Sequence, residues 1–323
     1  MMSTTIGDQF WAQMFKNHIG QTKSNLATVT DELAKGRHSD LASAQTSNLG
    51  LHAAMKSQLS DLSAFRQIQR DADVFFITVD LSLDHMQSVT GELGQDVLKT
   101  SQSVTPDAVM QFTERAFENM RVYFDKTQVT PLGLNQFGNL GTDLALDDPE
   151  NLINDLLQQV APLSDDAATA KNQVINLVTQ KYNPPEIGQP NFIVSATTTL
   201  EHRTDTADGA IKHAIAATVI LAHAQSQTGE SARDLARVAG ELLLESEVHF
   251  IAARASNGIH QEITENATAQ TEAARASIDT TLSEIETVDV AERAAELKQL
   301  EAQLEKVYLL TARINNLSLT DYL

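Results

Sequence analysis

The sequence predicts a mainly α-helical protein, in which long N- and C-terminal helices pack as a coiled-coil-like bundle and a smaller central insertion mixes α and β structure. The 323 residues are 42% hydrophobic but only 5% aromatic. Ala, Leu, Val and Ile dominate the apolar set, which suits helix packing better than a sheet sandwich. Both ends carry apolar residues at alternating steps of three and four, whereas the middle contains prolines and a short run of β-branched residues.

Residues 1–45 contain the first predicted helix, which runs from Thr5 to Lys35. Gly36 follows where a glycine commonly ends an α-helix, because a glycine adopts the left-handed conformation found there. The short polar connector 37–45 comes next. The apolar seam of this helix, with steps of three, four and seven residues, consists of Phe15, Ile19, Leu26, Val29 and Leu33.

Residues 46–105 contain a second and much longer predicted helix, from about Ser47 to Lys99. Twelve positions from 58 to 97 follow steps of four and three without a break, and nine of them are apolar. At ~1.5 Å per residue this helix would be roughly 80 Å long. Its apolar seam consists of Leu62, Phe65, Ala72, Phe76, Val79, Leu83, Met86, Leu93 and Val97.

The central insertion, residues 106–230, is predicted to hold several shorter elements. Proline at a first helical position indicates one helix from Pro106 to about Tyr123. A second helix is predicted to begin at Pro149, with Asp148 as its N-cap. Further helices are predicted at residues 164–182 and 208–223, a β-hairpin at 192–200 and a linker at 225–230.

The apolar pattern returns in the C-terminal third of the chain. Residues 231–288 are predicted to pair with 46–105 as a long-helix bundle, along a seam that weakens toward its end. Asp289 and Glu292 have the spacing of a capping box, which predicts that a separate helix starts there, within residues 289–323. The seam of that helix consists of Leu297, Leu300, Leu304, Val307, Thr311 and Ile314, and the helix ends near Leu317.

Long apolar seams at both ends of the chain need partners. A lone amphipathic helix is only marginally stable in water, because its apolar side chains remain exposed. The two ends therefore either meet each other or bind other chains. The simpler alternative is a pair of αα-hairpins inside an ordinary helical bundle.

A formal net charge of −20 and the absence of any Lys/Arg cluster argue against phosphate binding. We therefore expect no nucleic acid and no membrane as partners, since anionic lipid surfaces would repel the chain as well. No stretch approaches the ~18 apolar residues of a membrane span, and no cleaved signal peptide is recognisable. The absence of cysteine excludes disulfides, thiolate metal sites and cysteine nucleophiles.

Candidate catalytic and metal-binding patterns are weak. Glu241, Glu245 and His249 fall on one helical face. Di-metal helical bundles, however, use Glu-x-x-His motifs on two helices, and the residue three before His249 is Ser246. Neither a Gly-x-Ser-x-Gly elbow nor a phosphate-binding loop occurs. The sequence therefore predicts no enzyme, no cofactor, no metal site and no catalytic residue.

Three short stretches match a known family in their order and in their distances from the chain ends. They are Leu33-Ala34-Lys35-Gly36-Arg37, the internal set Gly133, Phe137, Gly138, Thr142, Asp143, Ala145 and Leu146, and the run from Leu297 to Leu323. At these positions the chain resembles the bacterial flagellin superfamily. The C-terminal run looks most like the flagellin-like hook-filament junction (hook-associated) proteins of α-proteobacteria.

This resemblance implies a structural subunit of the bacterial flagellum that joins hook to filament through its terminal helices. A filament-forming flagellin is the first alternative, and a helical-bundle enzyme or binding module is a distant one. The implied partners are copies of the chain itself, other hook-associated proteins and flagellin, and a flagellar export chaperone. The implied location is the extracellular flagellum, reached by export without a cleaved signal peptide.

The resemblance also implies a role for each predicted part. Residues 1–45 and 289–323 would form an inner assembly layer, 46–105 with 231–288 the long-helix bundle, and 106–230 an outward module. The predicted assembly interface consists of Phe15, Ile19, Leu26, Val29, Leu33, Leu297, Leu300, Leu304, Val307, Ile314 and Leu317.

Overall fold

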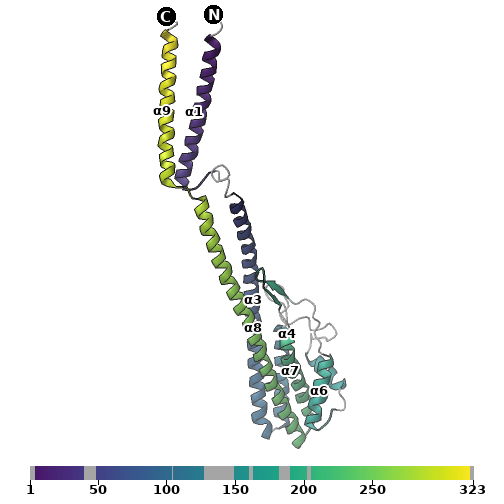
Figure 1. The fold of residues 1–323 in the computed structure, drawn as a ribbon. Helices are drawn as coiled ribbons and strands as arrows, with labels where there is room; N and C mark the ends of the chain where they lie inside the picture. Colours follow the sequence, from purple (N-terminus) through teal and green to yellow (C-terminus); the bar gives the residue numbers. More distant parts are fainter. Residues whose placement is uncertain are drawn as a thin grey trace. The chain divides into compact units, whose positions relative to one another are not determined.

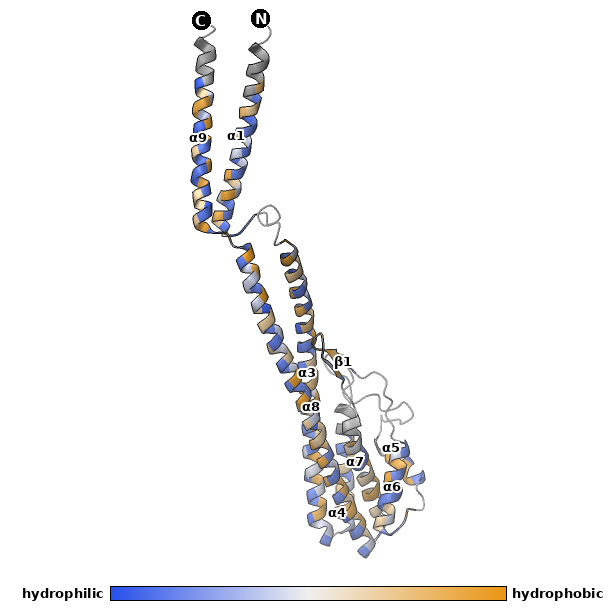
Figure 2. Cartoon of the chain, in the orientation of Figure 1, coloured by the Kyte–Doolittle hydropathy of each residue, from blue (hydrophilic) through white to orange (hydrophobic). Residues whose placement is uncertain are grey.

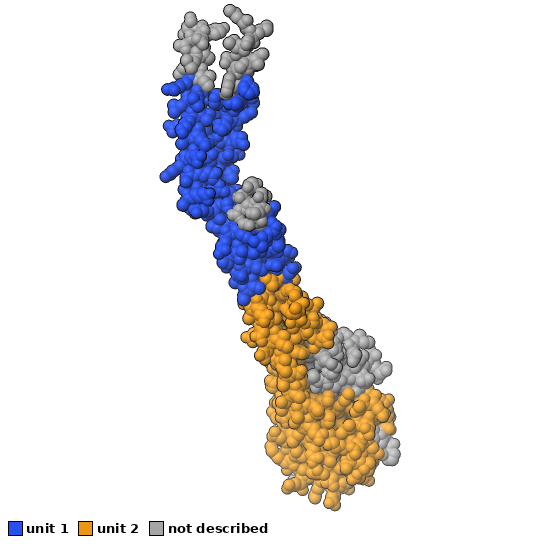
Figure 3. Space-filling model, in the orientation of Figure 1, with its two compact units in different colours: residues 1–61, 273–323 blue, residues 62–272 orange. Residues whose placement is uncertain are grey.

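The computed structural model describes residues 4–39, 49–103, 105–126, 149–159, 163–181, 190–201 and 205–320 (Figure 1). Across these ranges the chain is almost entirely helical, with one sheet of two short strands. The predicted fold class, mainly α with a small central α/β insertion, is therefore confirmed. The chain divides into two compact units, residues 1–61 with 273–323 and residues 62–272 (Figure 3).

The first unit contains the two terminal helices, α1 (Thr4–Lys35) and α9 (Val290–Thr320). The first turns of α3 (Leu49–Thr100) and the last turns of α8 (Gly229–Glu286) belong to the same unit. All four helices were predicted from the apolar periodicity. The predicted separate start of the last helix is confirmed, since α8 ends at Glu286 and α9 begins four residues later.

The second unit is built from shorter helices packed on the remaining parts of α3 and α8. Its other elements are η1 (Ser101–Ser103), α4 (Pro106–Lys126), α5 (Pro149–Gln159), α6 (Ala167–Lys181), β1 (Asn191–Ile193), β2 (Thr199–Glu201) and α7 (Asp205–Ala224). Both helices predicted to open on a proline do so. The linker predicted at 225–230 is shorter than expected, because α8 already begins at Gly229.

The helix predicted at 164–182 begins three residues later, at Ala167. Asp166 caps it, since its Oδ2 accepts a hydrogen bond of 2.9 Å from the Thr169 N–H. A hydrogen bond from the Thr169 hydroxyl, together with this backbone bond, lowers the pKa of Asp166. The predicted N-cap Asp148 and the internal family-like set from Gly133 to Leu146 lie outside the described residues.

Helix α7 is enclosed by the other helices of the second unit. Every side chain from Ala214 to Leu221 is buried. Helices α4, α5 and α6 contact it, and Ser246 of α8 donates a hydrogen bond of 2.7 Å to the carbonyl of Ala210. A helix that is apolar on nearly all sides needs such surroundings, and the hydropathy of α7 agrees with its position (Figure 2).

Polar side chains set the register between α3 and α8 inside the second unit. The guanidinium of Arg254 contacts Asp80 (Nε to Oδ1, 3.2 Å) and Asp84 (Nη1 to Oδ1, 2.5 Å). The buried amide of Asn257 donates a hydrogen bond of 2.8 Å to the carbonyl of Phe76. Because buried polar groups are costly without partners, sliding one helix along the other would break these contacts.

The predicted β-hairpin is confirmed as β1 and β2, with Phe192 opposite Leu200. The Phe192 ring packs against Phe75 and Phe76 of α3, with centroid distances of 5.4 and 5.6 Å. Gln69 of α3 donates from Nε2 to the carbonyl of Val194 at 2.7 Å. An apolar contact and a buried hydrogen bond therefore hold this otherwise marginal two-stranded element.

Candidate assembly interface

The terminal helices α1 and α9 lie along each other, although nearly the whole chain separates them in sequence (Figure 1). Helix α1 ends because Gly36 takes a φ of +67°, and its N–H donates to the carbonyl of Glu32 at 2.7 Å. Helix α9 begins because Asp289 accepts hydrogen bonds from the N–H groups of Ala291 (2.8 Å) and Glu292 (3.1 Å).

Backbone hydrogen bonds join the end of α1 to the segment before α9. The N–H of Val288 donates to Gly36 O at 3.2 Å, and the N–H of His38 donates to Glu286 O at 2.9 Å. Arg37 and Thr287 form an isolated antiparallel bridge between these two bonds. The two helices therefore leave this junction from fixed positions.

An ion pair at the same end links the helices through side chains. Glu32 of α1 is buried, and its Oε2 lies 3.1 Å from Arg293 Nε of α9. The other oxygen of Glu32 accepts a hydrogen bond of 2.9 Å from the Ser39 N–H. Both oxygens of this buried carboxylate thus have partners, as its burial requires.

Glu286, at the end of α8, gathers several cationic groups. Its Oε1 lies 2.9 Å from His52 Nε2 and 3.4 Å from Lys56 Nζ of α3, and its Oε2 lies 3.5 Å from Arg37 Nη1. The hydrogen bond from His52, assisted by Lys56 and Arg37, lowers the pKa of Glu286 below its ordinary value. This carboxylate therefore ties α3 to the junction between α1 and α9.

The predicted interface residues with described side chains are all at least half-buried in the isolated chain. Val29, Leu300 and Val307 are buried, with exposed fractions of 3, 9 and 8%. Those that are half-buried are Phe15, Ile19, Leu26, Leu33, Leu297 and Leu304. The side chains of Ile314 and Leu317 lie outside the described residues. The two seams therefore serve first to join α1 to α9.

Two polar members of this contact were missed by reading apolar residues alone. Thr22 is only 4% exposed, and its hydroxyl is satisfied by donating to the carbonyl of His18 at 2.8 Å. Thr22 comes three residues after Ile19 and four before Leu26, so it continues the spacing of the apolar seam. This spacing could have identified Thr22 as a seam residue from the sequence. No sequence pattern indicated that Glu32 is buried, because its burial depends on the ion pair with Arg293 from the other end of the chain.

One face of the helix pair is hollowed into a groove of about 550 Å³. Its lining, which we call the α9 groove, consists of Leu26, Glu301, Leu304, Glu305, Tyr308, Leu309 and Ala312. Leu309 is 62% exposed and Tyr308 is 46% exposed. Lys23 Nζ lies 5.8 Å from the centre of the Tyr308 ring, a distance at which the cation and the ring attract.

Exposed apolar side chains also occur outside this groove on the same two helices. Phe10 and Met14, one turn apart on α1, are 64 and 43% exposed, and Leu310 on α9 is 49% exposed. None of the three belongs to the predicted seams. Exposed large apolar side chains on both helices are candidates for contacts with other chains.

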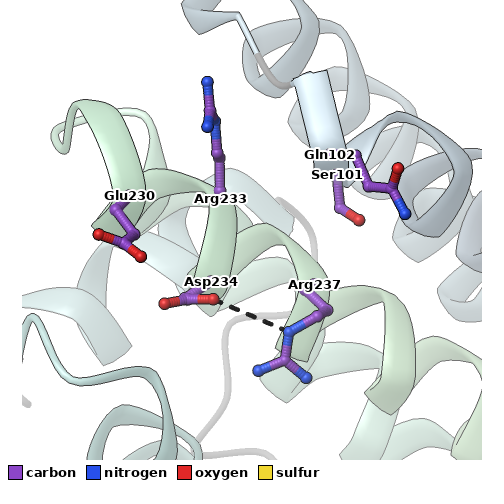
Figure 4. A pocket seen from close by; sticks show the side chains of 6 residues that line it. All are labelled: Ser101, Gln102, Glu230, Arg233, Asp234 and Arg237. Carbon is purple, nitrogen blue, oxygen red and sulfur yellow. Dashed lines mark ion pairs between the residues drawn. The ribbon is translucent and has the colours of Figure 1, made fainter.

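A second hollow, of about 520 Å³, lies in the other unit where α8 begins and α3 ends (Figure 4). Arg237 contacts Asp234 at 3.8 Å and Glu241 at 2.5 Å, whereas the side chain of Arg233 extends away from Asp234. Acidic and basic groups are balanced here, and nothing aligns a nucleophile with a base. We find no support for catalysis in this hollow.

The residues of the weak metal-site pattern have other partners in the structure, and Glu245 Oε2 also lies 3.7 Å from His213 Nε2. Glu241 contacts Arg237, whereas Glu245 contacts Lys171 at 2.9 Å. The His249 ring stacks on His213 with a centroid distance of 4.9 Å. Among the residues that the structure describes, no three His, Asp or Glu side chains are grouped to hold a metal ion.

The C-terminal part of the chain matches a known protein family. None of the described helices has the length and apolarity needed to cross a membrane. No curated protein matches the chain. Residues 248–323, which contain α9 and the last turns of α8, match the family model of the bacterial flagellin C-terminal helical region, and this match supports the resemblance to the flagellin superfamily.

Proposed function

We propose that the protein is a structural, non-enzymatic subunit of the bacterial flagellum and joins hook to filament through its terminal helices. One observation supports this most directly. Helix α9, inside the region that matches flagellin, packs along α1 and still exposes apolar side chains such as Leu309. The pair therefore leaves apolar side chains exposed that a neighbouring subunit can cover.

The proposed partners are copies of the chain itself, other hook-associated proteins and flagellin, and a flagellar export chaperone. The proposed location is the extracellular flagellum, reached by export without a cleaved signal peptide. We assign residues 1–45 and 289–323 to the inner assembly layer and 106–230 to an outward module. That both chain ends belong to one compact unit supports the first assignment.

The direct test is complementation of a deletion strain, with flagella counted by electron microscopy. The full-length protein should restore flagella, and a truncation lacking residues 307–323 should be produced but fail to enter them. The truncation leaves the second unit, residues 62–272, intact, so circular dichroism provides a control for folding. Normal motility with the truncated protein would exclude the proposed role.

A filament-forming flagellin is the alternative, and the description of the matching family favours it as much as a junction protein. The two roles differ in copy number and polymer length. A flagellin should form long filaments when purified, whereas a junction protein should not. In a deletion strain, loss of a junction protein would leave hooks without filaments and release flagellin into the medium.

A further inference from the structure

We propose that two copies bind through different flanks of the paired terminal helices, with a basic apolar ridge of one copy seated in the acidic α9 groove of the next. The ridge, which we call the Leu310 ridge, consists of Met14, Lys306, Leu310 and Arg313. This inference rests on the proposed function and deepens it by naming the surfaces that meet.

The groove and the ridge lie on opposite flanks of the contact between α1 and α9. On α9 the groove residues recur at 301, 304, 305, 308, 309 and 312, and the ridge residues at 306, 310 and 313. At ~100° per residue the centres of these two sets are about 140° apart around the helix. The buried side chains of Leu300 and Val307, which face α1, lie in the wider arc, about 120° from the centre of the groove set and about 100° from the centre of the ridge set, at ~100° per residue.

The side chains of α1 can also be sorted into a groove side and a ridge side. Lys23 and Leu26 lie on the groove side, since Lys23 reaches Tyr308 and Leu26 lines the groove. Met14 is about 120° from Leu26 around α1, at ~100° per residue, with Val29 between them. It therefore lies on the ridge side, and Phe10, one turn earlier and 64% exposed, continues that side.

The two flanks are complementary in charge. Glu301 and Glu305, both exposed, border the groove. Lys306 and Arg313, also exposed, stand on either side of Leu310 on the ridge, which contains no acidic residue. Lys23, on the α1 side of the groove, faces the Tyr308 ring. Opposite charges around an apolar centre favour binding of the ridge to the groove over ridge to ridge or groove to groove.

A second copy of the chain is the occupant because it carries the complementary surface itself. The contact is heterologous, since the two surfaces that meet are different. Each bound copy then leaves one groove and one ridge free at the ends of the assembly, so further copies add until a ring closes or a filament grows. A two-fold symmetric dimer would instead use the same surface twice.

Disulfide cross-linking tests this pairing cleanly, because the chain has no cysteine. Leu309→Cys labels the groove and Leu310→Cys labels the ridge, although the two positions are adjacent in sequence. Mixing the two variants under mild oxidation should give several-fold more disulfide-linked dimer than either variant alone. Ser24→Cys, at an exposed site on the side of α1 turned away from α9, is the matched control partner.

Exchanging the charges of residues 305 and 306 provides a second test in the same cross-linking assay. Glu305→Lys and Lys306→Glu should each lower the yield of mixed dimer several-fold. Both changes in one chain should restore it, because residues 305 and 306 then carry exchanged charges and attract each other again. Both side chains are exposed, so these changes leave the contact between α1 and α9 intact.

The inference fails if either cysteine variant alone cross-links as well as the mixture, which would indicate a symmetric dimer. It also fails if the mixture gives no more dimer than the Ser24→Cys control, or if the double charge exchange does not restore the yield. The proposed function would survive all of these results if the protein still restores flagella in the deletion strain.

Discussion

Leu98 of α3 lies so close to Gly240 of α8 that a β-carbon at position 240 would be 2.8 Å from Leu98 Cγ. The two long helices therefore approach each other closely at a point where one of them has no side chain. A β-carbon at Gly91 of α3 would be nearer still to a neighbour, 2.6 Å from Glu247 Cδ. That neighbour, however, is the end of a flexible side chain and can move aside.

The first prediction follows from this contrast. Gly240→Ala should lower the free energy of unfolding by about 1–3 kcal/mol, because the added methyl group overpacks the contact with Leu98. Gly91→Ala should leave it unchanged or raise it by up to about 1 kcal/mol, because alanine favours the helix and Glu247 can rotate away. Urea denaturation of the two variants measures both values, and equal destabilisation would contradict the interpretation.

The second prediction concerns pH. Burial lowers the pKa of His260, whose ring packs against Phe76 with a centroid distance of 5.1 Å. As the pH falls through the ordinary value of 6.5, the unfolded chain takes up a proton that the folded chain does not. The free energy of unfolding should therefore decrease from pH 7.5 to 5.

The control is a variant that keeps the aromatic packing and removes the titration. In His260→Phe the loss of stability between pH 7.5 and 5 should be smaller than in the parent protein. His85→Gln, at an exposed histidine of α3, should leave the loss unchanged. If His260→Phe shows the full loss, the buried imidazole is not its source.

The third prediction concerns the ion pair between the chain ends. Glu32→Gln should loosen the end of α1 by about 1–3 kcal/mol, because it weakens the contacts of a buried carboxylate with Arg293 and Ser39. Asp31→Asn weakens the contacts of an exposed carboxylate with Lys35 and with the Ser39 hydroxyl, and it should affect the end of α1 much less. The rate of amide hydrogen exchange near residue 36 measures the effect of each substitution on the end of α1. Equal rates in the two variants would argue against a special role for Glu32.

The fourth prediction separates packing within the chain from binding between chains. Val307→Ala removes a buried side chain and should speed amide exchange in α1 and α9 of the isolated protein. Leu309→Ala removes a side chain that is 62% exposed. It should leave exchange unchanged while lowering the amount of protein found in flagella. Should both variants change exchange equally, Leu309 is part of the internal contact and not of an outer surface.

Periodicity alone predicted the terminal helices and their need for partners, because apolar residues such as Val29 and Val307 repeat at steps that place them on one side of a helix. It left open whether the two helices pair with each other or with other chains. The short elements of the second unit were also predictable, since Pro106 and Pro149 stand at helix starts. The first and last residues of these short elements were less predictable. The start of α6 depends on a capping choice between Ser164 and Asp166 that only the local hydrogen bonds decide.

The candidate site was only partly predictable. The seams identified which side chains join α1 to α9, but the surface left over depends on how the two helices lie against each other. Tyr308 and Leu309 look like ordinary exposed residues in the sequence, and they form a groove only because Leu26 of the other helix closes one side. The assembly role of the predicted residues remains a prediction.

The division of the chain into units also sets an order of folding. Residues 62–272 form one continuous stretch, so the second unit can form as soon as residue 272 is available. The first unit combines residues 1–61 with 273–323 and cannot be completed until the last residues arrive. Its contacts span almost the whole chain, so their formation involves the largest loop-closure entropy. A chain whose two ends are kept apart therefore cannot form the contact between α1 and α9.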